Sequence, residues 1–497
     1  MSADLVNRAE QLAAAGRWGE VAALLEPLSG NSASAGLWSM LAMARLRTDN
    51  HSGAADAFLR AASLDAEGGR AWLNAATVLS QVGRMAEAAD AASQAIRLGF
   101  APPEAHLLLA RALQRAGDPD GAEAAFEAAI ASRPNFAAAH GELAQLLWMR
   151  TGDREAATER LHAAIAAHPG ESDLRDVLMR LLKAAGDESG AQVAAAGLLG
   201  VMPSGPSRRL LEAREADLRG DYPAAAEAAR DAAKLGADIS QSLEALSSAQ
   251  LASGEAAGLL ATAEEWLGHD EFNQLAIAYR ATALRMLGDP RGDAFRDYET
   301  LVRSFDIDVP EKWPGIAAFL SDLSTALAPM HSFEAYPLGQ SIRGGSQTME
   351  PLLQSMDPAI RGFFEAIDGP IRRYMAGLGT GSDPLRVRNR GAYAIKGSWS
   401  VWLKPGGFHV DHVHPQGWIS SACYIQTPRV SEDEEHKEGW IRFGQPPLQP
   451  PGGLSAEYFV QPRPGRLVLF PAWMWHGTVP FTSDERRLTV AFDVLPA

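Results

Sequence analysis

The segment at residues 408–418, FHVDHVHPQGW, contains two pairs of residues that could bind a metal ion. One pair is His409 with Asp411, and the other is His412 with His414. Side chains two positions apart in an extended strand point to the same face, so the two pairs would face opposite ways and cannot both serve one site. His409 with Asp411 has the better ligand chemistry, because two histidines and a carboxylate commonly hold non-haem iron(II). The spacing alone leaves both choices open.

A third histidine and an arginine lie further along the chain. His476 is found in LFPAWMWHGTVPF, and Arg487 begins the segment RLTVAFDVL. If that segment is a strand, Arg487 and Thr489 share one face, where a guanidinium and a hydroxyl can together hold a carboxylate. These residues indicate an iron site beside a pocket for a dicarboxylate.

Strands are needed to position these residues, and the C-terminal part of the chain is expected to supply them. Two helical stretches come first, at residues 316–330 and about 357–377. They are followed by short apolar runs broken by glycine and proline, which predict a sandwich, jelly roll or small barrel. The runs are AYAIKGSWSVWLKP, FHVDHVH, WISSACYIQTP, GWIRFG, EYFVQP, GRLVLFPAW and RLTVAFDVL.

The N-terminal part follows a different pattern, in which glycines recur every 34 or 35 residues. They are Gly83, Gly117, Gly152, Gly186, Gly220, Gly254 and Gly288. Extending the series backwards reaches Asn50 and Gly16, both suited to a turn that ends a helix. Prolines follow where each second helix should stop, at Pro134, Pro169 and Pro203.

This period and punctuation resemble tetratricopeptide-like helical hairpins over about residues 1–304. Small residues, usually alanine, recur at fixed positions after each turn. Their size lets two helices approach closely. The last two hairpins, around Gly254 and Gly288, lack this alanine signature and are expected to be irregular.

The C-terminal motifs also carry a resemblance. His412-Val413-His414-Pro415, Ile419-Ser420, GRLVLFPAWMWHGTVPF and ERRLTVAFD resemble the iron(II)/2-oxoglutarate-dependent oxygenases, in particular a prolyl-hydroxylase-like branch with a His-x-His ligand pair. QSIRGGSQT resembles stretches just upstream of that core in proteins that join tetratricopeptide repeats to it. The resemblance covers about residues 335–497. It implies a double-stranded β-helix that uses iron(II), O2 and 2-oxoglutarate, releases succinate and carbon dioxide, and hydroxylates a second substrate.

Residue by residue, the resemblance makes His412 the first metal ligand and His476 the distal one. His414 stands where the family has a carboxylate, so the metal centre is more positive by one charge. Choosing His412 and His414 keeps the match with the downstream segments, whereas choosing His409 and Asp411 breaks it. We therefore favour His412, His414 and His476, and expect Asp411 and His409 on the solvent side or behind the ligands.

The same resemblance assigns the cosubstrate contacts. Arg487 matches the residue that pairs with the far carboxylate of 2-oxoglutarate, with help from Tyr424 and Thr489. We also expect Arg343 to contact the substrate and Trp418 to border the pocket.

The predicted fold class is a multidomain α + β protein: an all-α tetratricopeptide-like solenoid over residues 1–304, then a double-stranded β-helix (jelly-roll) domain over 305–497. Within the second domain, linker and support helices are expected over 305–380 and the β-helix core over 381–497. The repeats are expected to capture a protein or peptide substrate, and the alternative is that they only form a homodimer or tether the enzyme elsewhere.

Bulk properties narrow the partners and the compartment. The formal charge of −16, from 61 acidic and 45 basic residues, argues against nucleic acid or an anionic membrane as a general partner. Neither a secretory signal nor an apolar run long enough to span a bilayer is visible, which makes the cytoplasm the expected compartment. The single cysteine, Cys423, rules out an internal disulfide and reads as a small buried hydrophobe.

Two other functions fit part of the sequence. The His-x-His pair could mark a repeat scaffold whose β-domain has lost catalysis. Three histidines also bind iron in cupin-type dioxygenases that need no 2-oxoglutarate, although such an enzyme has no reason to carry Arg487 and Tyr424.

Overall fold

The structure, a computed structural model, describes residues 3–27, 34–65, 68–349 and 351–497. The chain forms two compact units, one of residues 1–146 with 157–177 and the other of residues 147–156 with 178–497. The first unit is helical, and the second contains both helices and sheets.

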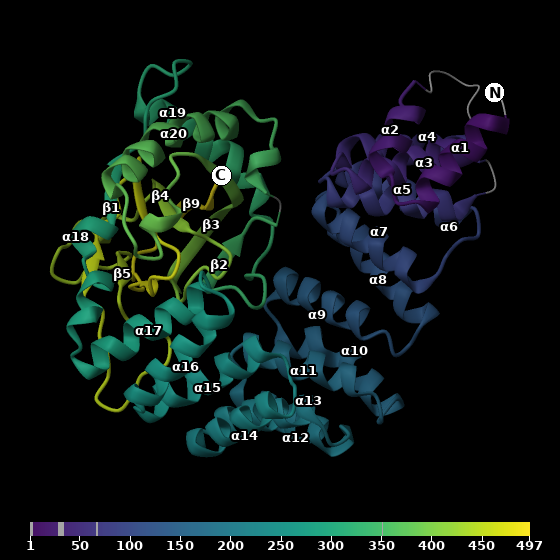
Figure 1. Cartoon of the computed structure of the whole chain (residues 1–497). Coiled ribbons are helices and arrows are strands. Elements are labelled where there is room, and N and C mark those ends of the chain that lie inside the picture. The colour runs from purple at the N-terminus through teal and green to yellow at the C-terminus, as the bar shows by residue number, and fades with distance from the viewer. Residues whose placement is uncertain (1–2, 28–33, 66–67, 350) are drawn as a thin grey trace. The chain divides into compact units, whose positions relative to one another are not determined.

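A tetratricopeptide-like solenoid of helical hairpins forms the N-terminal part, as predicted (Figure 1). Its helices are α1 Ala3–Ala14, α2 Trp18–Leu25, α3 Ala35–Arg47, α4 His51–Leu64, α5 Gly69–Gln81, α6 Met85–Arg97, α7 Pro103–Arg115, α8 Pro119–Ser132, α9 Ala137–Thr151, α10 Arg154–Ala167, α11 Ser172–Ala184, α12 Glu188–Val201, α13 Pro206–Leu218, α14 Tyr222–Lys234, α15 Ile239–Ser253, α16 Ala256–His269 and α17 Gln274–Leu287. Alanines fill the interfaces between neighbouring helices, because their small side chains allow close approach.

The recurring glycines occupy left-handed turns, with φ between 63° and 82° from Gly83 to Gly288. This backbone conformation favours glycine because it has no Cβ. The turn predicted at Asn50 is wrong by one residue. Asp49 has the left-handed φ of 59°, while Asn50 caps α4 and its Oδ1 accepts a hydrogen bond from the Gly53 amide at 3.0 Å.

The helix-ending prolines lie as predicted, two residues after the last residues of α8, α10 and α12. The expectation of irregular hairpins holds only at the end of the series. Gly254 joins α15 and α16 in a regular hairpin, whereas α17 is followed by a 3-10 turn at Pro290–Phe295 and the short helix α18, Tyr298–Leu301.

The C-terminal part contains two antiparallel sheets, consistent with a jelly-roll oxygenase domain. The larger sheet has the order β1-β7-β4-β9-β3-β2 and the smaller one β6-β5-β8. The strands are β1 Arg303–Asp306, β2 Ile342–Gln347, β3 Tyr393–His409, β4 Ile419–Gln426, β5 Ile441–Phe443, β6 Tyr458–Val460, β7 Arg466–Pro471, β8 His476–Thr478 and β9 Arg487–Pro496. The boundary predicted at residue 304 falls inside β1, which pairs with β7.

The predicted strand FHVDHVH is the exception among the seven runs. Strand β3 ends at His409, and residues 410–418 form a loop that contains an isolated β-bridge between His412 and His476. Strands β1, β2 and β8 were not among the predicted runs.

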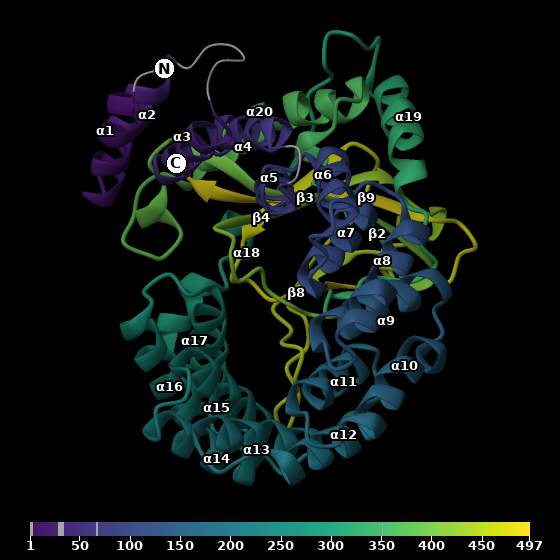
Figure 2. The same cartoon turned by 90° about the vertical axis from the view of Figure 1, so that its right-hand side faces the viewer.

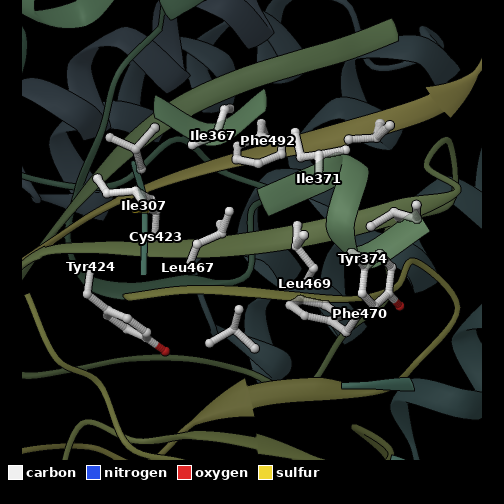
Figure 3. Packing of buried hydrophobic residues seen from close by; sticks show 14 of the residues in the cluster. Ile307, Ile367, Ile371, Tyr374, Cys423, Tyr424, Leu467, Leu469, Phe470 and Phe492 are labelled. Atoms are coloured by element: carbon white, nitrogen blue, oxygen red, sulfur yellow. The ribbon is translucent and has the colours of Figure 1, made fainter. Parts of the chain in front are cut away.

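Both helices predicted before the strands are present, as α19 Ile316–Leu327 and α20 Pro358–Leu378. They pack on the larger sheet, where α20 supplies Ile367, Ile371 and Tyr374 to the core in Figure 3. Cys423 on β4 is buried in the same core as a free thiol, as expected. Tyr424, its neighbour, points to the other side of the strand, because successive side chains alternate between faces (Figure 3).

Strand β9 follows the same alternation along its length. Leu488, Val490, Phe492 and Val494 belong to the core beneath the helices. The intervening residues line a pocket on the opposite face, and they are Arg487, Thr489, Ala491 and Asp493. In the described part of the chain, no helix combines the length and the apolar character needed to cross a bilayer.

One prediction concerns His331, whose ring nitrogens lie 2.9 Å from Ser346 Oγ and 3.0 Å from Ser400 Oγ. Burial lowers the pKa of His331 from 6.5 to about 4. As the pH falls below 6.5, this histidine is protonated in the unfolded chain but stays neutral in the folded chain, and this lowers the free energy of unfolding. Acidification from about pH 7.5 to about pH 5.5 should therefore cost roughly 1 kcal/mol more unfolding free energy in the native chain than in His331→Gln. Urea unfolding at both pH values measures the difference. Replacement of the exposed His162 by Gln serves as the control and should not change it.

Candidate metal centre

Three histidines converge between the two sheets. The Nε2 atoms of His412 and His414 are 3.2 Å apart, and the ring centroids of His412 and His476 are 4.2 Å apart. One ligand atom from each of the three residues lies within 4.8 Å of the others. The structure thus brings together the three residues predicted as ligands.

Backbone pairing positions these rings. His412 and His476 exchange backbone hydrogen bonds of 2.9 and 3.0 Å, and the His414 amide donates to the Ala472 carbonyl at 2.9 Å. The loop that follows β3 is therefore fixed to β8 and to the segment before it. Pairing, rather than an extended strand, places His412 and His414 on one side.

Hydrogen bonds also fix the ring tautomers. The Nδ1 atoms of His412 and His476 lie 2.8 Å and 2.9 Å from the carbonyl oxygens of Val410 and Met474, which can only accept. His414 Nδ1 lies 2.7 Å from Asp493 Oδ1. With the proton on Nδ1, each Nε2 offers a lone pair, and close lone pairs repel one another unless a cation lies between them. The donor set therefore fits a divalent metal ion such as iron(II).

Burial keeps the rings of His412 and His476 neutral, which is the state that binds metal. Burial, together with neighbouring His414, lowers the pKa of His412 to about 3. The pKa of His476 is also well below its usual value, chiefly because the ring is buried. Neither ring needs to lose a proton near neutral pH before it can act as a ligand.

Asp411 is engaged elsewhere. Its carboxylate accepts hydrogen bonds from Arg442 Nε at 3.0 Å, Arg442 Nη2 at 2.7 Å and Gln445 Nε2 at 3.0 Å. Only 6% of the residue is exposed, so it does not lie on the solvent side, which was one of the two positions expected for it. The cause is Arg442 on β5, a partly buried cation that pairs with Asp411 and that the local sequence did not reveal.

His409 also departs from expectation, because it lines the same pocket as the three histidines. Its Nδ1 lies 2.9 Å from Ser341 Oγ, and its ring centroid lies 6.0 Å from that of His412. The two faces assigned from strand spacing do not apply beyond His409, where β3 ends.

The predicted cosubstrate residues lie beside the histidines in a pocket of about 700 Å³. Arg487 is 2% exposed, and within the described residues its Nε and Nη1 atoms have no hydrogen-bond partner. The Tyr424 hydroxyl is likewise unpaired in this part of the chain, and its ring centroid lies 5.1 Å from the Arg487 guanidinium carbon. Thr489 lines the same pocket. A buried cation without a counter-ion is costly, so this end of the pocket suits an anion.

Of the two further predicted pocket residues, one lines the pocket and the other does not. Arg343 lines the pocket, although its Nη1 donates to the carbonyls of Gln340 and Ile342. Trp418 lies in the core beneath the helices, and its Nε1 donates to the Leu385 carbonyl, so it does not border the pocket.

Sequence reasoning gave no role to Trp399, Ser420 or Asp493, all of which lie against His414. The alternation in RLTVAFDV could have placed Asp493 on the face of Arg487, but its approach to His414 depends on pairing between distant segments.

The last repeat helix supports the metal loop from outside. Tyr279 on α17 packs edge-on against Trp475, with ring centroids 5.8 Å apart, and Trp475 Nε1 donates to Thr282 Oγ1 at 2.9 Å. Val413 joins the same apolar cluster. Residues adjacent to all three histidines thus pack on a solenoid helix.

Family models match both parts of the chain. Residues 397–493 match the model described as "Putative 2OG-Fe(II) oxygenase". Residues 39–104 and 113–175 each match a model described as "Tetratricopeptide repeat". The predicted combination of tetratricopeptide repeats followed by an oxygenase domain is confirmed. The oxygenase match contains the three histidines and Arg487, and it ends at Asp493.

Several solved structures are similar at low identity. A tetratricopeptide repeat protein from Parabacteroides merdae is 14% identical, with a TM-score of 0.34, covering 50% of this chain and 98% of its own. Part of a repeat protein from Cytophaga hutchinsonii is 15% identical, with a TM-score of 0.32, covering 40% of this chain and 83% of its own. YrrB, described as a TPR protein with an unusual peptide-binding site, is 18% identical, with a TM-score of 0.27, covering 34% of this chain and 88% of its own. Likenesses of this size do not indicate a shared function. No curated protein matches the chain.

Proposed function

We propose that the protein is an iron(II)- and 2-oxoglutarate-dependent dioxygenase that hydroxylates a protein or peptide held by its repeats. The observation that carries the proposal is the juxtaposition of two complementary sites in one pocket. Three imidazoles offer lone pairs to a cation, and the buried Arg487 in the same pocket has guanidinium nitrogens without a hydrogen-bond partner among the described residues.

His412, His414 and His476 would hold the iron. Arg487 would bind the far carboxylate of 2-oxoglutarate, with the Tyr424 hydroxyl and Thr489 as further hydrogen-bond donors. When bound, iron supplies the chemistry that couples the reduction of O2 to the decarboxylation of 2-oxoglutarate and the oxidation of a second substrate. Phe470 and Ile441 line the same pocket and limit the entry of water around the charged end of the cosubstrate.

A groove on the solenoid supports a polypeptide substrate. Tetratricopeptide repeats commonly mediate protein interactions. The first helices of successive hairpins, including α13, α15 and α17, line a pocket of about 270 Å³. Figure 2 shows α13 to α17 side by side in chain order. Arg214, Gln241, Glu244 and Tyr279 lie in this pocket, so it offers charged and hydrogen-bonding groups to a peptide backbone or side chain.

The groove and the metal loop share a residue. Tyr279 lines the groove and also packs on Trp475, next to His476. A polypeptide held in the groove is therefore kept close to the metal centre, which raises its effective concentration there.

Reconstitution with iron tests the enzymatic part of the proposal. The full chain, loaded anaerobically with iron(II) and given 2-oxoglutarate, should form succinate only after O2 is admitted. Iron binding without succinate formation would favour the three-histidine dioxygenase that does not use 2-oxoglutarate. Absence of iron binding would favour the inactive scaffold.

A groove variant tests substrate capture. Arg214→Ala removes a cation and its hydrogen bond of 2.6 Å to Gln241. We expect it to lower hydroxylation of captured polypeptides by roughly tenfold, while succinate formed without substrate stays the same. After incubation with a peptide library, mass spectrometry detects hydroxylation as the addition of one oxygen atom. Arg230→Ala, on α14 and outside the pocket, is the matched control. Equal hydroxylation by both variants would contradict capture at this groove and favour a role of the repeats in dimer formation or localisation.

A further inference from the structure

The ligand set has no carboxylate, but a carboxylate stands directly behind one ligand. Asp493 Oδ1 accepts a hydrogen bond of 2.7 Å from His414 Nδ1. The side chains of His414 and Asp493 are only 11% and 14% exposed, so solvent screens their interaction weakly. The histidine at the family's carboxylate position is therefore the one that contacts an acidic residue.

The other two ligands are supported differently. His412 and His476 direct Nδ1 to backbone carbonyls, which are neutral. Asp411, the other acidic side chain in this part of the fold, is paired with Arg442. Within the described residues, Asp493 is the one acidic side chain hydrogen-bonded to a residue of the three-histidine cluster.

The fold fixes this contact from two sides. Asp493 lies on β9, opposite Ser420 in the β4–β9 register, and Ser420 Oγ is 3.1 Å from the same Nδ1. Trp399 on β3 stacks on the His414 ring, with centroids 5.6 Å apart and an interplanar angle of 24°. His414 cannot turn away from Asp493 without breaking these contacts.

We infer that Asp493 supplies through His414 the negative charge that the ligand set itself lacks. A carboxylate that accepts the Nδ1 proton makes Nε2 a stronger electron donor and offsets part of the positive charge of a bound metal. The Nδ1 proton of His414 stays in its hydrogen bond to Asp493, and no covalent bond is formed or broken. Asp493 is a positioning residue that acts on the metal only through the imidazole. This inference rests on the metal site of the proposed function.

Cobalt(II) titration of the full chain measures the effect without turnover, through the visible absorption of the bound ion and competition with a chelator. Asp493→Asn keeps the shape and a hydrogen-bond acceptor but removes the charge. Its affinity for cobalt should fall about tenfold. Ser420→Ala, which removes a neutral contact to the same nitrogen, is the control and should change affinity by no more than about twofold.

Testing Asp493→Asn in a second variant, His414→Asp, distinguishes an effect that passes through His414 to the metal from a purely structural ion pair. His414→Asp places a carboxylate in the ligand set and removes the imidazole that links Asp493 to the metal. In that background, adding Asp493→Asn should no longer weaken cobalt binding, and relief of repulsion between two carboxylates should leave it unchanged or tighter. An equal loss in both backgrounds would overturn the relay, because the effect would then not pass through His414.

Thermal unfolding of the metal-free variants completes the test. A purely structural role predicts a lower melting temperature for Asp493→Asn with unchanged cobalt affinity, which overturns the inference and leaves the proposed metal site intact. Failure of the native chain to bind cobalt or iron(II) would remove the proposed function and this inference together.

Discussion

Replacement of His414 by alanine should reduce the affinity of the chain for iron(II) by roughly 100-fold or more, since it removes one of three ligands. His412→Ala and His476→Ala should have similar effects, because all three ligand atoms lie within 4.8 Å of one another. Iron retained after anaerobic reconstitution and gel filtration gives the measurement.

Asp411→Asn is the informative comparison. It leaves the three rings untouched but removes the charge that pairs with Arg442 at 2.7 Å. Such a variant should be less stable, by a few kcal/mol, because a partly buried arginine loses its partner. It should nevertheless bind iron. Loss of iron binding in a folded Asp411→Asn protein, together with full binding by His414→Ala, would assign the metal to His409 and Asp411 instead.

Replacement of Arg487 by leucine should raise the concentration of 2-oxoglutarate needed for half-maximal succinate formation by roughly tenfold or more, corresponding to about 1.5–3 kcal/mol. The guanidinium is fully buried and has unpaired donors, so the cosubstrate loses a charge-assisted contact that water cannot replace. Leucine fills part of the space, and iron binding should persist.

Arg486→Leu is the matched control for this variant. Arg486 is adjacent in sequence but lies on the other side of β9, with its guanidinium carbon 4.6 Å from the Trp402 ring centroid. Its replacement should leave the 2-oxoglutarate dependence unchanged. The reverse outcome, with Arg486→Leu weakened and Arg487→Leu normal, would move the carboxylate contact to Arg486.

Much of this protein follows from the sequence alone, because the relevant signals are local. The interval between glycines fixes where each hairpin turns, since only a residue tolerant of a left-handed φ can end these helices without strain. Alternation along RLTVAFDV places Arg487 and Thr489 on the face opposite Leu488 and Val490 for the same kind of reason, because the strand repeat is two. Both predictions hold in the structure.

The tertiary structure decided what depends on partners far along the chain. The alternation of side chains along a strand could not choose between the two candidate metal pairs, because residues 410–418 are not part of a continuous strand. Backbone hydrogen bonds to β8 and Ala472 hold them instead. Burial of Asp411 depends on Arg442, and the contact of Asp493 with His414 spans 79 residues. Such contacts are set by sheet register and by the need to pair buried charges, and neither is encoded in the spacing of neighbouring residues.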